Sequence, residues 1–390
     1  MKKALKIFGV FTGLILLTMW ITDTTYLIRG VRTVYLRGNT DVGIDDYTVQ
    51  ETSTIKASQP EAWPLHEAYN SIALSDDFKS FNHKQKSIAY LVIENGEIIS
   101  ETYFGEGSSN HLSGIWSISK SYTSFLLLKA RQDGLIDDLN DPVSKYLPEW
   151  TVQQEQPLTL RHLASMNTGL FWDEMDHSPF SLIAKLNFYG NLEAYTLEDL
   201  YAIGEPGTLQ HYNSGGTQLL GTVLNRILEP KTITTYLEET FWDPLNYEND
   251  GLFILDSRTH KNEKTFGGLV STARNVSRLG QLINNKGWWN DQQILTEDDI
   301  SLITSLPYNN TTYTYGLWTG KYQGDRYYYQ AGFGGQFCIS FPKYNLVITR
   351  LGHQTSKKEH INAVSPDTKI YINEALRIVN KIRKTKTPSI

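Results

Sequence analysis

The sequence has a single cysteine, Cys338, so it cannot form a disulfide within the chain or a zinc cage built from thiolates. Its 9 histidines form no H-E-x-x-H pattern and no other dense group of ligands. These absences exclude a disulfide-stabilised scaffold and argue against a catalytic metal. We therefore expect no metal and no other cofactor.

The chain also lacks an excess of positive charge. It carries 36 lysines and arginines against 42 aspartates and glutamates, for a formal net charge of -6. On average such a surface repels a phosphate backbone, so nucleic acid is not expected as a partner. The chain has no internal repeat or low-complexity tract, and 40% of its residues are hydrophobic, so it can bury a large core.

Only one long apolar run occurs, and it lies at the N-terminus, over residues 7–21. Three lysines precede it: Lys2, Lys3 and Lys6. Positive charge before an apolar run is typical of an export signal, and no A-x-A-like cleavage site follows, so we expect an uncleaved signal-anchor over residues 1–22. The positive flank predicts an exported body, periplasmic or extracellular. Three arginines beyond the run weaken this orientation: Arg29, Arg32 and Arg37. An ordinary core helix is the alternative.

Residues 23–62 are polar and have no sustained periodicity, so they are expected to connect the anchor to one main domain over residues 63–390. That domain begins with β-rich runs on either side of Asn95-Gly96, the pair preferred in type I′ hairpin turns. Further β-rich runs lie near the C-terminus, at 327–329, 337–341 and 346–351, and an amphipathic helix follows over 367–383.

The stretch between these β-rich ends, residues 135–300, has mainly the pattern of helices and loops. We therefore predict an α+β fold. Strands from both ends of the domain form one antiparallel sheet flanked by helices, and a mainly helical region is inserted between them. A cleft is expected where the two regions meet.

A candidate nucleophile lies at the start of a predicted helix, in the tetrad S-I-S-K at residues 117–120. Residues three apart on a helix share one face, so the Lys120 amine can reach the Ser117 hydroxyl. Serine becomes a useful nucleophile when a neighbouring base takes its proton, and lysine can be that base. The pattern alone is weak, because Ser53 and Ser340 also begin S-x-x-K tetrads. Ser340 lies in a strand-like run and Ser53 in the polar connector, so only Ser117 opens an apolar helix.

A second block, residues 206–221, places Tyr212 between a Pro-Gly-Thr approach and a pair of glycines. A tyrosine held near the lysine can carry protons between nucleophile and leaving group. Glycines let the backbone approach a substrate closely. The tripeptide Tyr-Asn-Ser also occurs at residues 69–71, without these flanking residues. A half-buried structural tyrosine is the alternative for Tyr212.

A third block, residues 330–336, is the glycine-rich stretch Q-A-G-F-G-G-Q between β-rich runs. A strand beside an acyl-transfer site can offer a backbone N–H to an oxyanion. Taken alone, the same stretch is more simply a turn between strands. A separate acidic segment, either a rim of the cleft or a solvated loop, contains Trp172, Asp173, Glu174 and Asp176.

In order and spacing, the three blocks resemble one family of serine hydrolases. It includes class C β-lactamases, D-alanyl-D-alanine carboxypeptidases, some esterases and 6-aminohexanoate-dimer hydrolases. The resemblance covers about residues 85–350 and implies a β-lactamase/transpeptidase-like fold. Further short matches are Asp133-Gly134-Leu135, Asp141-Pro142-Val143, Tyr146-Leu147-Pro148, Leu160-Arg161-His162-Leu163, Thr168-Gly169-Leu170 and Gly267-Gly268-Leu269.

The resemblance implies a role for each residue of the site. Ser117 would be the nucleophile, Lys120 its base and Tyr212 the second proton carrier. The N–H groups of Ser117 and of Phe333, the residue after Gly332, would form the oxyanion hole.

Two positions depart from the β-lactamase pattern. Ser214 stands where asparagine is usual, and Gln330 stands where lysine or histidine is usual. Both are expected to face the substrate. Gln330 lacks a positive charge and Ser214 lacks an amide, so both are poorly suited to a carboxylate-bearing β-lactam or D-alanine peptide. The pattern is most similar to the 6-aminohexanoate-dimer hydrolase and esterase branch.

The sequence therefore predicts an exported serine hydrolase that cleaves a small-molecule ester or amide through an acyl-enzyme on Ser117. The membrane is the other partner expected, through residues 1–22. One alternative is a D-Ala-D-Ala carboxypeptidase or β-lactamase-type enzyme of the same fold. The other is a non-catalytic, penicillin-binding-like sensor, against which the presence of serine, lysine and tyrosine argues.

Overall fold

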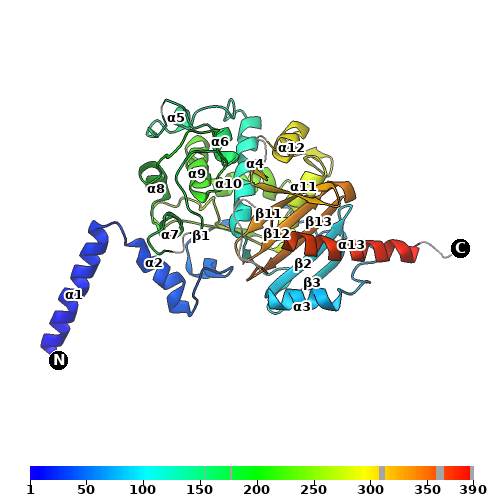
Figure 1. The fold of residues 1–390 in the computed structure, drawn as a ribbon, viewed down its shortest axis with the longest axis horizontal. Helices are drawn as coiled ribbons and strands as arrows, with labels where there is room; N and C mark the ends of the chain where they lie inside the picture. The colour runs from blue at the N-terminus through cyan, green and yellow to red at the C-terminus, as the bar shows by residue number, and fades with distance from the viewer. Residues whose placement is uncertain (154, 176–177, 307–311, 357–363, 387–390) are drawn as a thin grey trace.

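Figure 1 shows the computed structural model, which describes residues 1–153, 155–175, 178–306, 312–356 and 364–386. The helices are α1 (Lys2–Ile21), α2 (Tyr26–Thr33), α3 (Asp76–Lys84), α4 (Ser119–Gln132), α5 (Val143–Tyr146), α6 (Leu160–Ala164), α7 (Leu182–Phe188), α8 (Leu192–Glu198), α9 (Ser214–Leu228), α10 (Ile233–Leu237), α11 (Ala273–Asn284), α12 (Glu297–Thr304) and α13 (Asp367–Lys386). The strands are β1 (Thr52–Ile55), β2 (Ser87–Glu94), β3 (Glu97–Tyr103), β4 (Ser113–Gly114), β5 (Gly251–Ile254), β6 (Leu269–Ser271), β7 (Trp288–Trp289), β8 (Gln292–Gln293), β9 (Tyr313–Thr314), β10 (Leu317–Tyr322), β11 (Asp325–Gly332), β12 (Gln336–Phe341) and β13 (Leu346–Gly352).

The main sheet has seven strands in the order β3-β2-β13-β12-β11-β10-β9. Its neighbouring strands are antiparallel, and β13 pairs with β2, so strands from the two ends of the domain meet inside one sheet. The β2–β3 hairpin turns at Asn95, with φ 54°, and Gly96, with φ 82°, the two positive values that a type I′ turn requires. The predicted hairpin and the predicted antiparallel sheet are confirmed.

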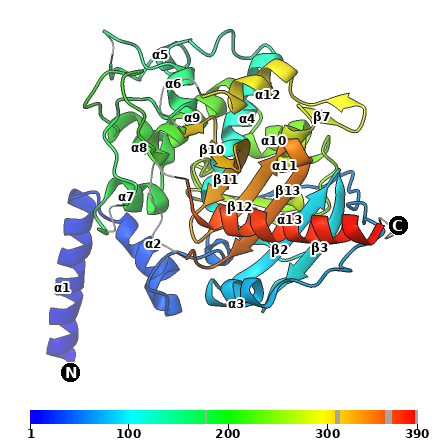
Figure 2. The ribbon, with the colours of Figure 1, turned by 45° about the vertical axis from the view of Figure 1, so that its right-hand side comes forward.

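Helices cover both faces of this sheet (Figures 1 and 2). On one face Tyr371 of α13 packs in an apolar cluster with Tyr90 and Val92 of β2. On the opposite face the apolar side chains of α4 and α11 pack with Leu91 and Ile93 of the same strand. Alternate residues of β2 therefore enter different cores, as the two-residue period of a strand requires. Coverage of both faces explains why β2 is almost entirely apolar.

The helical region, α5 to α10, lies beside the sheet, and α4 runs along the boundary between them (Figure 1). A small sheet with the order β1-β5-β6-β4 closes this boundary. Its β4 leads to Ser117 and pairs with β6, with Ser113 opposite Ser271. The pairing brings the start of α4 next to residues 266–268, which precede β6. This arrangement positions the candidate site.

The segment after the apolar helix is more structured than its polar sequence indicates. Helix α2 packs on α7, and the Tyr26 hydroxyl donates to the carbonyl of Pro179, shortly before α7, at 3.0 Å. A Cβ on Gly30 would lie 3.2 Å from the Phe188 ring, so glycine permits this close contact. Helix α2 was not predicted from the sequence, because its 8 residues are too few to show a sustained helical period.

Candidate active site

Ser117 lies in the turn that leads into α4. The chain forms a short 3₁₀ helix over Trp116–Ile118, and α4 begins at Ser119, so the nucleophile candidate precedes the α-helix instead of opening it. Ser117 is half-buried and lies on the wall of a cavity. Its hydroxyl is thus accessible to a substrate while its neighbours Ile118 and Ser119 are buried.

Lys120 is in contact with Ser117, as the tetrad predicts. The Lys120 side chain is buried, and its Nζ donates to Ser117 Oγ at 2.8 Å and to the Phe266 carbonyl at 2.8 Å. The nitrogen also lies 5.1 Å from the centre of the Tyr212 ring. The residues predicted as nucleophile, base and second proton carrier therefore lie together in space.

The other S-x-x-K serines are placed differently. Ser340 is in strand β12 and its buried hydroxyl donates to the Gly280 carbonyl at 2.9 Å. Ser53 is in strand β1. Neither residue is among those that line the Ser117 cavity. The choice of Ser117 from its context is therefore consistent with its place in the fold.

Tyr212 is held in the site by aromatic neighbours. Its ring stacks on Trp318 of β10, with centroids 5.4 Å apart, and meets the Tyr313 ring edge-on at 5.2 Å. Burial raises the pKa of Tyr313, and the nearby Glu174 carboxylate raises it further, so this supporting hydroxyl stays protonated. Tyr212 lines the cavity, which leaves its predicted catalytic role available.

Glu174 joins the acidic segment to the second block. Its carboxylate accepts from the Ser214 backbone N–H at 3.1 Å, from Ser214 Oγ at 2.5 Å and from Trp172 Nε1 at 2.5 Å. Glu174 and Ser214 line the cavity, so this part of the segment forms a rim, one of the two alternatives that the sequence left open. The Ser214 hydroxyl donates to the Glu174 carboxylate. The predicted contact of Ser214 with substrate stays a prediction. Asp176 lies outside the described residues.

In the third block, Gly332 and Phe333 line the cavity together with Ser117. A Cβ on Gly332 would lie 2.2 Å from the Ile115 carbonyl oxygen, so only glycine lets β11 approach the turn before α4 this closely. The Phe333 ring packs edge-on against Trp116 at 5.8 Å. These contacts bring the two segments of the predicted oxyanion hole together.

Gln330 has a different environment from the one expected. Its side chain is fully buried, it does not line the cavity, and neither amide atom has a hydrogen-bond partner among the described residues. Because β11 alternates its side chains, Gln330 points away from the surface that Tyr329 and Ala331 offer to the cavity. Its predicted contact with substrate is not evident in this arrangement and stays a prediction.

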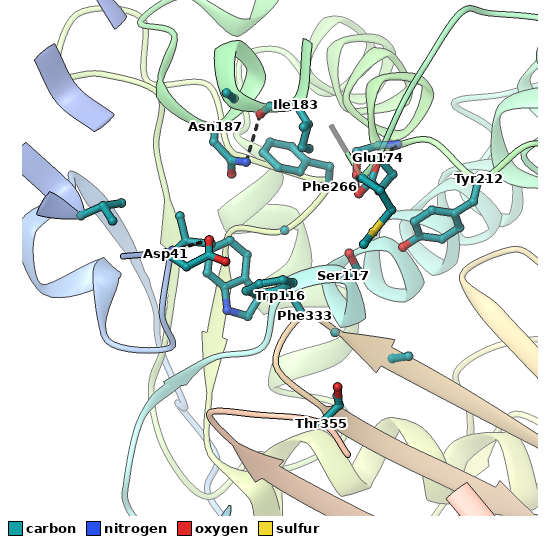
Figure 3. Close-up of a pocket in the computed structure, with 18 of the residues that line it drawn as sticks. Asp41, Trp116, Ser117, Glu174, Ile183, Asn187, Tyr212, Phe266, Phe333 and Thr355 are labelled. Atoms are coloured by element: carbon teal, nitrogen blue, oxygen red, sulfur yellow. Dashed lines mark hydrogen bonds between the residues drawn. The ribbon is translucent and has the colours of Figure 1, made fainter. Parts of the chain in front are cut away.

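The cavity has a volume of about 510 Å³ and extends from Ser117 to helix α2 (Figure 3). Among the described residues that line it, none is lysine or arginine, whereas Asp41, Glu174 and Asp367 are acidic. Most of the remaining wall is apolar or aromatic. The described lining is therefore largely apolar, and its charged side chains are acidic.

Comparison with known proteins identifies the family. A family model described as Beta-lactamase matches residues 74–364. The chain belongs to the beta-lactamase family. Within it, "Beta-lactamase-like protein 4" of Dictyostelium discoideum is 26% identical over 257 residues, covering 55% of this chain and 45% of that protein. "Acyltransferase calJ" of Penicillium decumbens is 27% identical over 176 residues, covering 40% of this chain and 41% of that protein. The chain spans less than half the length of these relatives.

Several solved structures have the same fold as this chain. A Bacillus anthracis protein assigned as a 6-aminohexanoate-dimer hydrolase has a TM-score of 0.67 at 20% identity, covering 87% of this chain and 92% of that one. A family VIII carboxylesterase has a TM-score of 0.63 at 17% identity, covering 81% of this chain and 99% of that one. A penicillin binding protein from Bacillus halodurans has a TM-score of 0.58 at 16% identity, covering 78% of this chain and 99% of that one. The β-lactamase/transpeptidase-like fold predicted from the sequence is confirmed.

Some residues of this site had no clear sequence signal. The Phe266 carbonyl, which accepts from Lys120, precedes the Gly267-Gly268-Leu269 match, and that match points to the segment without identifying the atom. Trp318 and Tyr313 lie far from Tyr212 in sequence and reach it through β9 and β10. Helix α2 contributes the far wall of the cavity and lies in the expected connector.

Proposed function

We propose that this beta-lactamase-family protein is a membrane-anchored serine hydrolase that cleaves an ester or amide through an acyl-enzyme on Ser117. The observation that carries the proposal is the 2.8 Å contact between Lys120 Nζ and Ser117 Oγ on the wall of an accessible cavity. A base within hydrogen-bond reach is what a serine needs to become nucleophilic. The serine, lysine and tyrosine that lie together here argue against a non-catalytic sensor.

In the proposed reaction, Lys120 acts as the base and takes the proton of Ser117 as the serine Oγ bonds to the carbonyl carbon of the substrate. The N–H groups of Ser117 and Phe333 stabilise the oxyanion. Tyr212 gives its proton to the leaving alcohol or amine as the bond to the carbonyl carbon breaks, and takes back the proton that Lys120 accepted. Water then attacks the carbonyl carbon of the acyl-enzyme and gives up a proton, which passes to Ser117 Oγ as the acyl–oxygen bond breaks and a carboxylic acid leaves.

The charge of the cavity favours esters and linear amides over β-lactams. A β-lactam or a D-alanine peptide carries a carboxylate beside the scissile bond. The described lining residues offer acidic groups and no lysine or arginine to meet it. A lost charge-assisted contact costs about 2 kcal/mol, or roughly thirtyfold in rate when it acts in the transition state.

Helix α1 supports the membrane part of the proposal. It is 20 residues long, none of its residues is buried against the body, and it projects away from it (Figure 1). Its length and composition fit a membrane anchor or a signal sequence. We infer that it anchors the protein and that the body lies on the exported side, because Lys2, Lys3 and Lys6 flank its start.

Covalent labelling tests the proposed chemistry. After exposure to a short-chain fluorophosphonate, mass spectrometry of the full-length protein should place the adduct on Ser117. Ser117→Ala and Lys120→Ala should each lose hydrolysis of p-nitrophenyl acetate by orders of magnitude, because residues of one catalytic unit act together. Ser340→Ala is the matched control and should keep the activity. An adduct on Ser53 or Ser340 would refute the assignment.

A further inference from the structure

The cavity beyond Ser117 is largely apolar, and helix α2 forms the wall far from Ser117. Five residues from Tyr26 to Val34 line it: Tyr26, Leu27, Gly30, Val31 and Val34. They recur at the spacing of one helical face, so α2 presents a continuous apolar surface to the cavity. Arg29 and Arg32 lie off this surface, outside the residues that line it.

Helix α7 forms the adjoining wall and is almost as apolar. It contributes Ile183, Ala184, Asn187 and Phe188 to the lining. The one polar side chain among them, Asn187, donates its amide to the Ile183 carbonyl at 3.0 Å. No charged side chain of α2 or α7 lines the cavity, and Asp41, in the segment after α2, is the acidic residue on this side. The two helices therefore offer an apolar wall that is suited to a hydrocarbon chain.

The position of this wall ties the cavity to the anchor. Only residues 22–25 separate the end of α1 from the start of α2. A helix that sits in a membrane would therefore hold α2, and the cavity behind it, close to the lipid surface. A substrate could pass from the bilayer to this pocket with little exposure of its apolar part to water.

The orientation of the site indicates which part of a substrate enters the pocket. In Figure 3, Tyr212 and Asp41 lie on opposite sides of Ser117, with Asp41 on the side of the blue N-terminal segment. Tyr212 is the proposed proton donor to the leaving group, so the leaving group is expected beside it. The acyl part then extends from Ser117 toward α2.

We propose that the pocket between Ser117 and α2 binds the long aliphatic acyl chain of a lipid ester drawn from the membrane. Its volume of about 510 Å³ falls within the range of about 300–1,000 Å³ typical of small-molecule sites. The inference rests on the proposed function and adds its substrate class: Ser117 takes the fatty acyl group, the alcohol leaves, and water releases a fatty acid.

Two exposed residues of α2 form a matched pair for the test. Val31 lines the pocket and is 44% exposed, whereas Ile28 does not line it and is 47% exposed. An aspartate at either position faces solvent in part, so the fold should tolerate both. Val31→Asp places a charge in the path of the acyl chain, and Ile28→Asp places the same charge outside it.

The measurement is kcat/KM of the full-length protein in nanodiscs for p-nitrophenyl acetate and p-nitrophenyl octanoate. The wild-type ratio of octanoate to acetate should be about tenfold or more, because each buried methylene favours binding in the transition state. Val31→Asp should lower this ratio about tenfold, and Ile28→Asp should leave it within about twofold. Circular dichroism confirms that both variants fold.

A second pair protects the test against a local folding defect. Tyr35 lines the pocket and Leu36 does not, and both are strongly exposed, at 62% and 77%. Tyr35→Asp should lower the ratio and Leu36→Asp should not. Failure to hydrolyse either ester and to label Ser117 would refute the proposed function itself. Acetate turnover without a preference for octanoate, or equal effects within both pairs, would refute the lipid-chain inference alone.

Discussion

At the scale of single residues, the chemistry depends on the turn before α4. Trp116 has φ 50°, a left-handed conformation that bulky residues rarely adopt. Its ring packs edge-on against Phe333 at 5.8 Å. A strained residue that persists beside a reactive group indicates that the surroundings hold it there. Trp116 therefore links Ser117 to the segment that carries the second predicted oxyanion donor.

Removal of one hydroxyl should separate a catalytic Tyr212 from a structural one. Tyr212→Phe keeps the ring contacts with Trp318 and Tyr313, so we expect an unchanged melting temperature and KM. Turnover of p-nitrophenyl acetate should fall about 100-fold or more, because a proton carrier is lost. The control is Tyr69→Phe, in the repeated Tyr-Asn-Ser tripeptide, where the hydroxyl donates to Glu101 at 2.6 Å. Equal turnover in wild type and Tyr212→Phe would show that the tyrosine is structural.

Gly332 offers an independent test of the oxyanion hole. In Gly332→Ala the new Cβ would meet the Ile115 carbonyl oxygen at 2.2 Å, so β11 must move away from the turn that carries Ser117. Displacement of one oxyanion donor costs about 100-fold to 1,000-fold in kcat. We expect a loss of that size in steady-state hydrolysis.

The matched control for this change is Gly204→Ala, because a Cβ there meets no atom within 4 Å. That variant should keep kcat within about twofold, by analogy with other neutral surface changes. A Gly332→Ala enzyme with normal kcat would contradict the predicted use of the Phe333 N–H.

At the scale of elements, α9 begins inside the site. Asn213 is buried at its N-cap, and its side-chain oxygen accepts from the Gly216 N–H. The capping residue separates Tyr212, which lines the cavity, from Ser214, which donates to Glu174. The second sequence block is therefore both a helix start and part of the cavity wall.

Lys264 joins three segments in the interior. Its Nζ donates to Gln50 Oε1 at 2.6 Å, near β1, and to the Asn187 carbonyl at 2.7 Å, at the end of α7. Burial, together with the charge of Arg29, lowers the Lys264 pKa to about 7 from its usual 10.5. Between these two pH values the unfolded chain binds a proton that the folded chain does not.

Stability should therefore rise with pH between about 7 and 10.5, and this contribution is lost as the pH falls toward 7. The slope contributed by one such proton is up to about 1.4 kcal/mol per pH unit. Chemical denaturation at pH 7.5 and pH 9 measures it. Lys264→Met should have a smaller rise than wild type, whereas Lys321→Met, at an exposed position, should match wild type. Equal slopes in all three proteins would show that Lys264 does not lose its proton in this range.

The elements themselves were predicted with uneven success. The β2–β3 hairpin, α11 and β13 have strong local patterns, so the sequence indicates them directly. Helix α2 is short and amphipathic and folds against α7, so its formation depends on residues more than 150 positions away. Glu174 became a site residue only because its loop returns to the start of α9.

At the scale of the whole molecule, α1 should determine where the protein resides. We expect the full-length chain to sediment with membranes and to stay there in high salt, with its body accessible to protease only from outside the cytoplasm. A chain that starts at residue 23 keeps α2 and should be soluble and active on p-nitrophenyl acetate. Recovery of the full-length chain in the cytosol, or protease access from the cytoplasmic side, would contradict the anchor or its orientation.

The sequence alone determined the features that depend on local order. The i, i+3 spacing of Ser117 and Lys120, the apolar run at the N-terminus and the hairpin turn are properties of neighbouring residues, so they can be read without a fold. The order and spacing of the three blocks indicated the family, and the β-rich runs at both ends of the domain indicated the antiparallel sheet.

The surroundings of the nucleophile depend on how distant segments pack together. Gln330 and Ser214 were expected to face the substrate. Strand alternation buries the Gln330 side chain, and the Glu174 carboxylate accepts a hydrogen bond from the Ser214 hydroxyl. The apolar wall opposite Ser117 comes from α2, which no local pattern connects with the site. Such contacts join residues distant in sequence, and their geometry follows from the packing of the whole chain.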